Sequence, residues 1–360
     1  MSYQLISLAV GAAALGTLVT DLPAGAMLSR IGLRPALIAG SGLVAISTLL
    51  LGISSGFTAL VALRFLAGIG AALWALSRHA YIAEVMPAAQ RGRALSLFGG
   101  INRAGIFAGP AVGGVIATLL GLSASFVAAS MLAFGALLLA MLLLKPTPRS
   151  ASGLAHAARW SIVGTLLRTH VRDLLSVALA MTLGQMIRAG RHLIIPLYGA
   201  QTLGLDAAQI GLAISVGAIL DVAMFIPAGF LMDRFGRKVA AVPSFAIMGV
   251  GVALIPQASD LSGLLLATAV IGVGNGLGSG VMMTLGADLA PPGATGEFLG
   301  VWRLLADSGS AIGPIAVGVV AGLVGLVGGA YVLAIFGILA SVTLAVLVQE
   351  THATAAQNTG

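Results

Sequence analysis

The side chains that could do chemistry in this sequence stand inside apolar runs long enough to cross a bilayer. Arg188 and Arg191 lie three residues apart, with Gln185 one turn earlier, so all three share one face of a helix. A charge at mid-membrane costs roughly 2.5 kcal/mol or more, so it tends to face a cavity or a partner. The pattern predicts either a site for an acidic group of a substrate or pairing with Asp221 or Asp307.

Three acidic residues inside apolar runs are candidates for carrying protons: Asp21, Asp221 and Asp307. Burial favours the neutral form of a carboxyl group, so such an acid can gain and lose a proton during a working cycle. A structural role as the charge partner of an arginine is the alternative. For Asp307, the simplest partner is Arg303, one turn earlier on the same helix.

Composition excludes an ordinary soluble domain. The 360 residues are 59% hydrophobic and 8% charged, with 50 glycines, and the mean hydropathy is +1.08. The sequence has no cysteine, which excludes disulfides, thiol catalysis and zinc–thiolate sites. It also lacks a phosphate-binding G-x-x-x-x-G-K-[ST] motif, a metal-ligand cluster and a hydrolase elbow, so we expect neither ATP-driven transport nor an enzyme.

Apolar runs of roughly 20 residues, the length of a membrane helix, recur along the whole chain. We predict eleven spans, at residues 4–28, 35–54, 57–84, 94–120, 123–144, 173–199, 208–232, 239–257, 261–289, 298–323 and 327–348. Only helices fit, because a backbone in lipid must satisfy its hydrogen bonds within each segment.

The basic residues predict the orientation of these spans. Lys and Arg between the spans fall in alternate loops, at residues 30–34, 91–93, 145–172 and 234–238, and the positive-inside rule makes these loops cytoplasmic. The formal net charge of +7 therefore sets the topology, and we expect no nucleic-acid partner. The segment at 145–172 links two halves and contains a stretch that could lie on the membrane surface as an amphipathic helix.

The chain is an internal duplication. At a constant offset of 204 residues, the interval from Pro23 to Pro227, glycines, prolines and arginines recur without an insertion. Parallel repeats of this kind are one way in which transporters are built.

Three motifs resemble those of the major facilitator superfamily. A basic loop of pattern G-x-x-x-D-R-x-G-R-[RK] is complete at Gly229, Asp233, Arg234, Gly236, Arg237 and Lys238. The first copy keeps only Gly25, Arg30, Gly32 and Arg34. Ser29 replaces its acid and Leu33 its second arginine, whereas in the family the first copy is usually the better one. The resemblance implies that these loops lock one of two access states by charge contacts.

The other two motifs lie within spans. "LVALRFLAGIGAA", residues 60–72, resembles the family's fourth-helix signature, with Ala67 in place of glutamine, and implies a role for Arg64 in proton coupling or cavity binding; snorkelling to the surface is the alternative. "GIFAGPAVGG" resembles the fifth-helix pattern of exporters that work by antiport. We expect it to form a flexible, closely packed hinge from Gly105, Gly109, Pro110, Gly113 and Gly114, with the equivalents Gly313 and Pro314.

The resemblance implies an all-α polytopic membrane protein with the major facilitator fold, built from two parallel-repeat helical halves. Eleven spans are present of an expected twelve, because the family's first helix has no counterpart in residues 1–360. We expect a start at an internal methionine, with a genuinely shortened chain as the alternative. The predicted organisation is an N-terminal half at 1–144, the linker at 145–172, a C-terminal half at 173–348 and a disordered tail at 349–360.

The sequence thus predicts a secondary transporter of a bacterial cytoplasmic membrane, a monomer that needs no cofactor and is driven by the proton gradient. By the family arrangement, the cavity helices contribute Arg64, Gln185, Arg188, Arg191 and Asn275. This positive, polar lining favours an anionic or zwitterionic substrate. The exporter-like motif favours proton-coupled efflux. A proton symporter or facilitator for a small anionic metabolite, and a membrane sensor or assembly partner without transport, are the alternatives.

Overall fold

The computed structural model describes residues 2–86, 88–145, 164, 171–290, 295–348 and 350, which are helical almost throughout. The chain forms two compact units. We call Leu8–Ser152 the N-terminal unit and Met1–Ser7 with Gly153–Gly360 the C-terminal unit. Most of the predicted linker at 145–172 and of the predicted tail at 349–360 lies outside the described residues.

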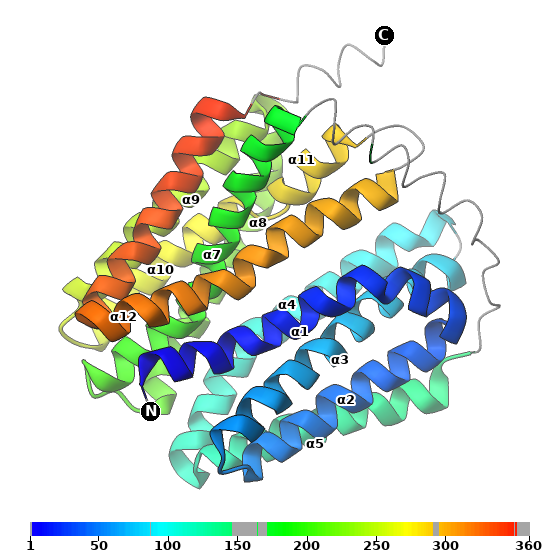
Figure 1. Ribbon diagram of the computed structural model, residues 1–360, viewed down its shortest axis with the longest axis horizontal. Coiled ribbons are helices and arrows are strands. Elements are labelled where there is room, and N and C mark those ends of the chain that lie inside the picture. The colour runs from blue at the N-terminus through cyan, green and yellow to red at the C-terminus, as the bar shows by residue number, and fades with distance from the viewer. Residues whose placement is uncertain are drawn as a thin grey trace. The chain divides into compact units, whose positions relative to one another are not determined.

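The N-terminal unit is a bundle of long antiparallel helices joined by short turns (Figure 1). They are α1 (Tyr3–Ile31), α2 (Leu33–Ile53), α3 (Phe57–Val85), α4 (Ala88–Leu120) and α5 (Leu122–Leu143). Within this unit α2 packs between α3 and α5, and α4 contacts α5 and α3. Gly32 and Gly121 have positive φ values of 93° and 89°, which lets the chain reverse within a residue or two.

The described part of the C-terminal unit is also a bundle of helices joined by short turns. Its elements are α7 (Val171–Gln201), α8 (Ala207–Phe235), α9 (Arg237–Leu254), η1 (Ile255–Gln257), α10 (Leu261–Leu277), α11 (Val281–Leu289) and α12 (Thr295–Leu347). α7 and α9 pack along α12, and α10 packs between α8 and α9 (Figure 1). α12 comprises two of the predicted spans, which meet at the non-helical Gly325 (φ 83°).

Equivalent hydrogen bonds show that the duplication extends to three-dimensional contacts. In the N-terminal unit, Nη2 of Arg34 donates to the carbonyl oxygen of Met141 at 2.8 Å. In the C-terminal unit, Nζ of Lys238 donates to the carbonyl oxygen of Ala345 at 2.7 Å. Both residues of the second pair lie 204 positions after those of the first, so the two repeats place the start of one helix against the end of another in the same way.

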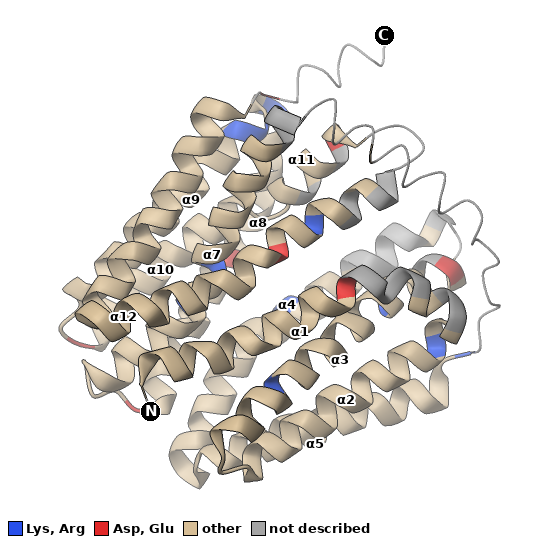
Figure 2. Ribbon diagram, in the orientation of Figure 1, with Lys and Arg blue, Asp and Glu red and all other residues tan. Residues whose placement is uncertain are grey.

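The outer surface of the helices is apolar. Leu132 is 79% exposed and Ile226 is 82% exposed, and large exposed side chains of this kind occur on most of the helices. Eight stretches of the described helices are long and apolar enough to cross a membrane. Figure 2 shows that most of the helix length carries neither acidic nor basic residues. The predicted all-α polytopic fold is therefore confirmed.

One predicted span is interrupted. The sequence predicted a single helix over 261–289, but α10 ends at Leu277 and α11 begins at Val281. Gly280 between them has a φ of +86°, a value that side chains other than glycine rarely allow. Non-helical backbone at membrane depth is tolerated where protein surrounds it or where it lines a cavity.

The predicted hinge glycines have different surroundings in the two repeats. A Cβ atom built on Gly309 or Gly313 of α12 would overlap carbonyl oxygens of α7, at Thr182 and Met186 respectively. A Cβ atom built on Gly109, the counterpart of Gly313, has no heavy atom of the described chain within 4 Å. α12 therefore uses its glycines to approach another helix, whereas Gly109 meets no such neighbour.

We expect Gly313→Ala to destabilise the protein by roughly 1–3 kcal/mol, because the added methyl group must push α12 away from α7. The matched change Gly109→Ala should be neutral or slightly stabilising, since alanine favours a helix over glycine by about 1 kcal/mol. Melting temperatures of the two variants in detergent measure the difference. An equal loss of stability in both would show that another helix covers this face of α4.

Candidate functional site

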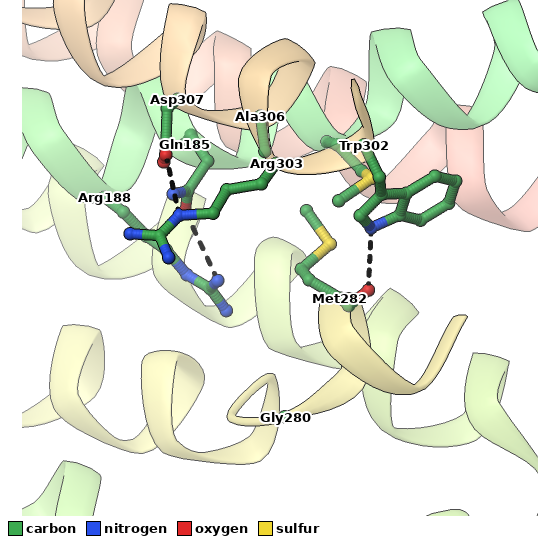
Figure 3. Close-up of a pocket in the computed structure, with 9 residues that line it drawn as sticks. Gln185, Arg188, Gly280, Met282, Trp302, Arg303, Ala306 and Asp307 are labelled. Carbon is green, nitrogen blue, oxygen red and sulfur yellow. Dashed lines mark hydrogen bonds and ion pairs between the residues drawn. The ribbon is translucent and has the colours of Figure 1, made fainter. Parts of the chain in front are cut away.

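A small cavity of about 250 Å³ lies within the C-terminal unit, beside the break between α10 and α11 (Figure 3). Ligand pockets usually measure roughly 300–1,000 Å³, so this one suits a small molecule or one group of a larger molecule. Its walls are formed by Met181, Gln185, Arg188, Gly280, Met282, Trp302, Arg303, Ala306 and Asp307. Two predicted cavity residues, Gln185 and Arg188, and one predicted coupling acid, Asp307, thus line the same cavity.

Arg188 is held in place by neutral acceptors. Its Nη2 donates to the carbonyl oxygen of Gly278 at 3.0 Å, and its Nη1 donates to Oε1 of Gln185 at 3.4 Å. The guanidinium carbon lies 5.1 Å from the centre of the Phe245 ring, which allows a cation–π contact. Among the described residues no carboxylate lies within ion-pair distance of Arg188.

The second arginine on α7, Arg191, is not part of the cavity lining. Its buried Nε has no hydrogen-bond partner among the described residues. Asp221 acts electrostatically on both arginines, but its carboxylate bonds to a neutral group: Nδ2 of Asn275 donates to Oδ2 of Asp221 at 2.7 Å. The predicted direct pairing of the two arginines with Asp221 or Asp307 is therefore not found.

The predicted pair along α12 is confirmed. Nε of Arg303 lies 3.2 Å from Oδ2 of Asp307, and their side chains are 42% and 21% exposed. Arg303 from α12 and Arg188 from α7 both line the cavity (Figure 3). The cavity therefore brings together two guanidinium groups and one carboxylate.

Trp302 and Met282 form a further wall of the cavity that was not predicted from the sequence. Nε1 of Trp302 donates to the carbonyl oxygen of Met282 at 2.9 Å, which ties the start of α11 to α12. Trp302 is 4% exposed. The cluster of glycines in "GVGNGLGSG" was the available signal, because glycine-interrupted apolar segments in transporters mark binding sites.

Two other predicted residues belong to the N-terminal unit and are described there alone. Nε of Arg64 on α3 donates to the carbonyl oxygen of Ala9 on α1 at 3.4 Å. Asp21 lies near the middle of α1 and is half-buried. Neither position contributes to the cavity of the C-terminal unit.

The complete copy of the basic loop forms a charged cluster. Nε of Arg237 lies 3.2 Å from Oδ2 of Asp288, and its Nη1 lies 3.4 Å from Oδ1 of Asp233. The carboxylate of Glu350 accepts hydrogen bonds from the backbone N–H groups of Arg237 (2.9 Å) and Lys238 (3.0 Å). An anion at the first turn of α9 satisfies donors that have no partner within the helix. Sequence reasoning missed both Asp288 and Glu350.

In the described part of the first copy no such cluster is found, and the sequence gives the reason, because its residues differ. Leu33 stands where Arg237 stands, and Pro146 occupies the position equivalent to Glu350. Glu84 is equivalent to Asp288 but has no arginine at the position of Arg237. The side chains of Gly25 and Arg30 lie outside the described residues. Charge contacts of the predicted kind therefore occur in the second loop, whereas the described part of the first retains only the bond from Arg34 to Met141.

Comparison with known proteins decides the family. The sequence profile of the Major Facilitator Superfamily matches residues 1–187 and residues 174–360. The chain belongs to this superfamily. Membership makes the chain a multi-pass membrane transporter.

The relatives of this chain carry names that refer to different compounds or to none. An uncharacterized MFS-type transporter of Methanocaldococcus jannaschii is 23% identical over 324 residues, which is 89% of this chain and 83% of the relative. The chromaffin granule amine transporter of Rattus norvegicus is 28% identical, covering 84% of this chain and 57% of its own length. The tetracycline resistance protein, class C, of Escherichia coli is 30% identical, covering 65% of this chain and 59% of its own. The chain thus spans under two thirds of the latter two proteins.

A solved structure supports the fold. The crystal structure of a D-xylose-proton symporter superposes with a TM-score of 0.77, covering 97% of this chain and 88% of that chain at 20% sequence identity. At this identity the likeness concerns the fold alone.

We expect Asp288→Asn to lower the stability of the protein by about 1 kcal/mol, because Arg237 loses a partly shielded ion partner. The matched change Glu84→Gln, at the equivalent position of the first repeat, should have little effect. Melting temperatures in detergent at low and high salt provide the test. The two variants losing equal stability would contradict a specific role for the second loop.

Proposed function

We propose that this protein is a secondary active transporter that moves a small solute across a bacterial cytoplasmic membrane in exchange for protons. It would act as a monomer. Export is supported by the motif "GIFAGPAVGG" and by similarity to a relative named for tetracycline resistance. The complete loop from Gly229 to Lys238 would then hold the C-terminal unit together through one half of the alternating-access cycle.

The bond between Asp221 and Asn275 is the observation that supports proton coupling best. It joins α8 to α10 through a carboxylate inside an apolar helix, and the same carboxylate acts electrostatically on Arg188 and Arg191. Protonation of Asp221 removes its negative charge and leaves the two arginines less compensated. A proton at this one position can therefore alter how the neighbouring cavity attracts a charged solute.

A second candidate function is symport of a proton with a small anion. It is favoured by the arginines, because an anion and the carboxylate of Asp221 would compete for the same positive charge. Protonation of the acid would then promote binding of the anion, and both would cross together. A cationic solute, by contrast, would compete with the proton and be exchanged for it.

We expect Asp221→Asn to abolish accumulation driven by a pH gradient, a loss of at least about tenfold, while exchange at equal pH on both sides continues. The measurement uses proteoliposomes with an internal pH dye and three radiolabelled probes: tetracycline, serotonin and nicotinate. Accumulation on the acidic side indicates exchange for protons, and accumulation on the alkaline side indicates symport.

Asp260→Asn is a suitable control. Hydrogen bonds from the backbone N–H of Gly263 and from the hydroxyl of Ser262 lower the pKa of Asp260, which caps α10. Because the folded-state pKa lies below the ordinary value, this carboxylate stays ionised at neutral pH and loses its charge only as the pH falls through that lower value. Asparagine also caps helices, so coupling should persist. Folded protein that couples none of the probes to protons would contradict the proposal.

A further inference from the structure

The helix break between α10 and α11 has a specific consequence for the cavity. Ending α10 at Leu277 frees the carbonyl group of Gly278, and this oxygen accepts a hydrogen bond from Arg188. A Cβ atom on Gly278 would lie 2.8 Å from Nη2 of Arg188 and would also overlap Ser244. The break therefore positions the guanidinium group at the cavity wall, where a neutral carbonyl holds it without cancelling its charge.

The cavity carries a surplus of positive charge. Arg188 has only neutral hydrogen-bond acceptors among the described residues, and Arg303 shares the carboxylate of Asp307. Two cations and one anion thus line the cavity, and the single carboxylate of Asp221, outside this lining, acts on both Arg188 and Arg191. In a site of low dielectric such a surplus is stabilised by an anion from outside.

The remaining walls restrict what that anion can be. Trp302, Met181, Met282 and Ala306 provide an apolar surface in a volume of about 250 Å³. A planar guanidinium group matches the two oxygens of a carboxylate, which it can bind through parallel hydrogen bonds. The space and the lining suit a compact ring or short chain attached to that carboxylate.

We propose that this cavity binds the carboxylate of a small monoanionic organic acid, seated on Arg188, with Arg303 released from Asp307 as a second donor. The inference rests on the proposed secondary transport and names a substrate class for it. The substrate carboxylate and the carboxylate of Asp307 would compete for Arg303. The inference therefore belongs to the second candidate function above, symport of a proton with a small anion.

The test measures binding without a gradient, using nicotinate as the probe and nicotinamide as its neutral counterpart of the same shape. Nicotinate should quench part of the tryptophan fluorescence, because Trp302 lines the cavity, and should raise the melting temperature of the purified protein, and nicotinamide should do neither. Arg188→Gln should weaken nicotinate binding at least about tenfold. Asp307→Asn should strengthen it several-fold, because the competing carboxylate is removed; misfolding cannot produce that gain.

Arg78→Gln is the matched control. Arg78 is also an arginine stacked on aromatic rings, 4.2 Å from the centre of Trp74 and 3.9 Å from that of Phe98, but it lies outside the cavity. Its replacement should leave nicotinate binding unchanged.

Equal binding of nicotinamide, an equal loss in both arginine variants, or no gain in Asp307→Asn would overturn the inference. Gradient-driven flux of tetracycline or serotonin without nicotinate binding would refute the inference alone, and nicotinate binding without any coupled flux would refute only the proposed function.

Discussion

The core of a bilayer offers no water to a polar group, so the backbone amides of a membrane span must find their hydrogen-bond partners within the protein. The helices satisfy almost all backbone groups internally, which is why the described chain is helical nearly throughout. The turn between α10 and α11 is an exception that falls inside a predicted span. There the free carbonyl of Gly278 is satisfied by Arg188, and Arg188 in turn gains an acceptor. The same constraint that enforces helices elsewhere creates a polar site where one helix is broken.

The two repeats show how one architecture supports unequal roles. Both place the start of one helix on the end of another through an equivalent hydrogen bond, from Arg34 in one unit and Lys238 in the other. The second repeat adds an ion pair from Arg237 to Asp288 and hydrogen bonds to Glu350. The first repeat keeps an acid, Glu84, but has Leu33 and Pro146 at the positions of Arg237 and Glu350.

The sign of the charge in the cavity links substrate class to the direction of transport. An acid that competes with a substrate anion for an arginine makes proton and anion travel together, whereas an acid that binds a substrate cation makes them exchange. The exporter-like motif and the arginine-lined cavity thus favour different directions. The motif and the arginines of the cavity therefore disagree about how proton and solute are coupled, and this disagreement does not concern the fold.

The sequence by itself determined the membrane class, the repeat and the superfamily, because apolar run length and the recurrence of glycine, proline and arginine are properties of the chain that need no contacts. It also predicted the bond between Arg303 and Asp307, which depends only on the spacing of one helical turn.

Contacts between distant segments were decided by the tertiary structure alone. Three such contacts join residues 20 or more positions apart: Trp302 on Met282, Asn275 on Asp221, and Glu350 on the start of α9. They depend on how each helix is rotated about its own axis, which packing decides. The glycines of "GVGNGLGSG" were a signal for the interruption at Gly278 to Gly280, but glycines also occur inside continuous helices of this chain. The residue that bonds to the interrupted backbone, Arg188, lies 90 residues earlier.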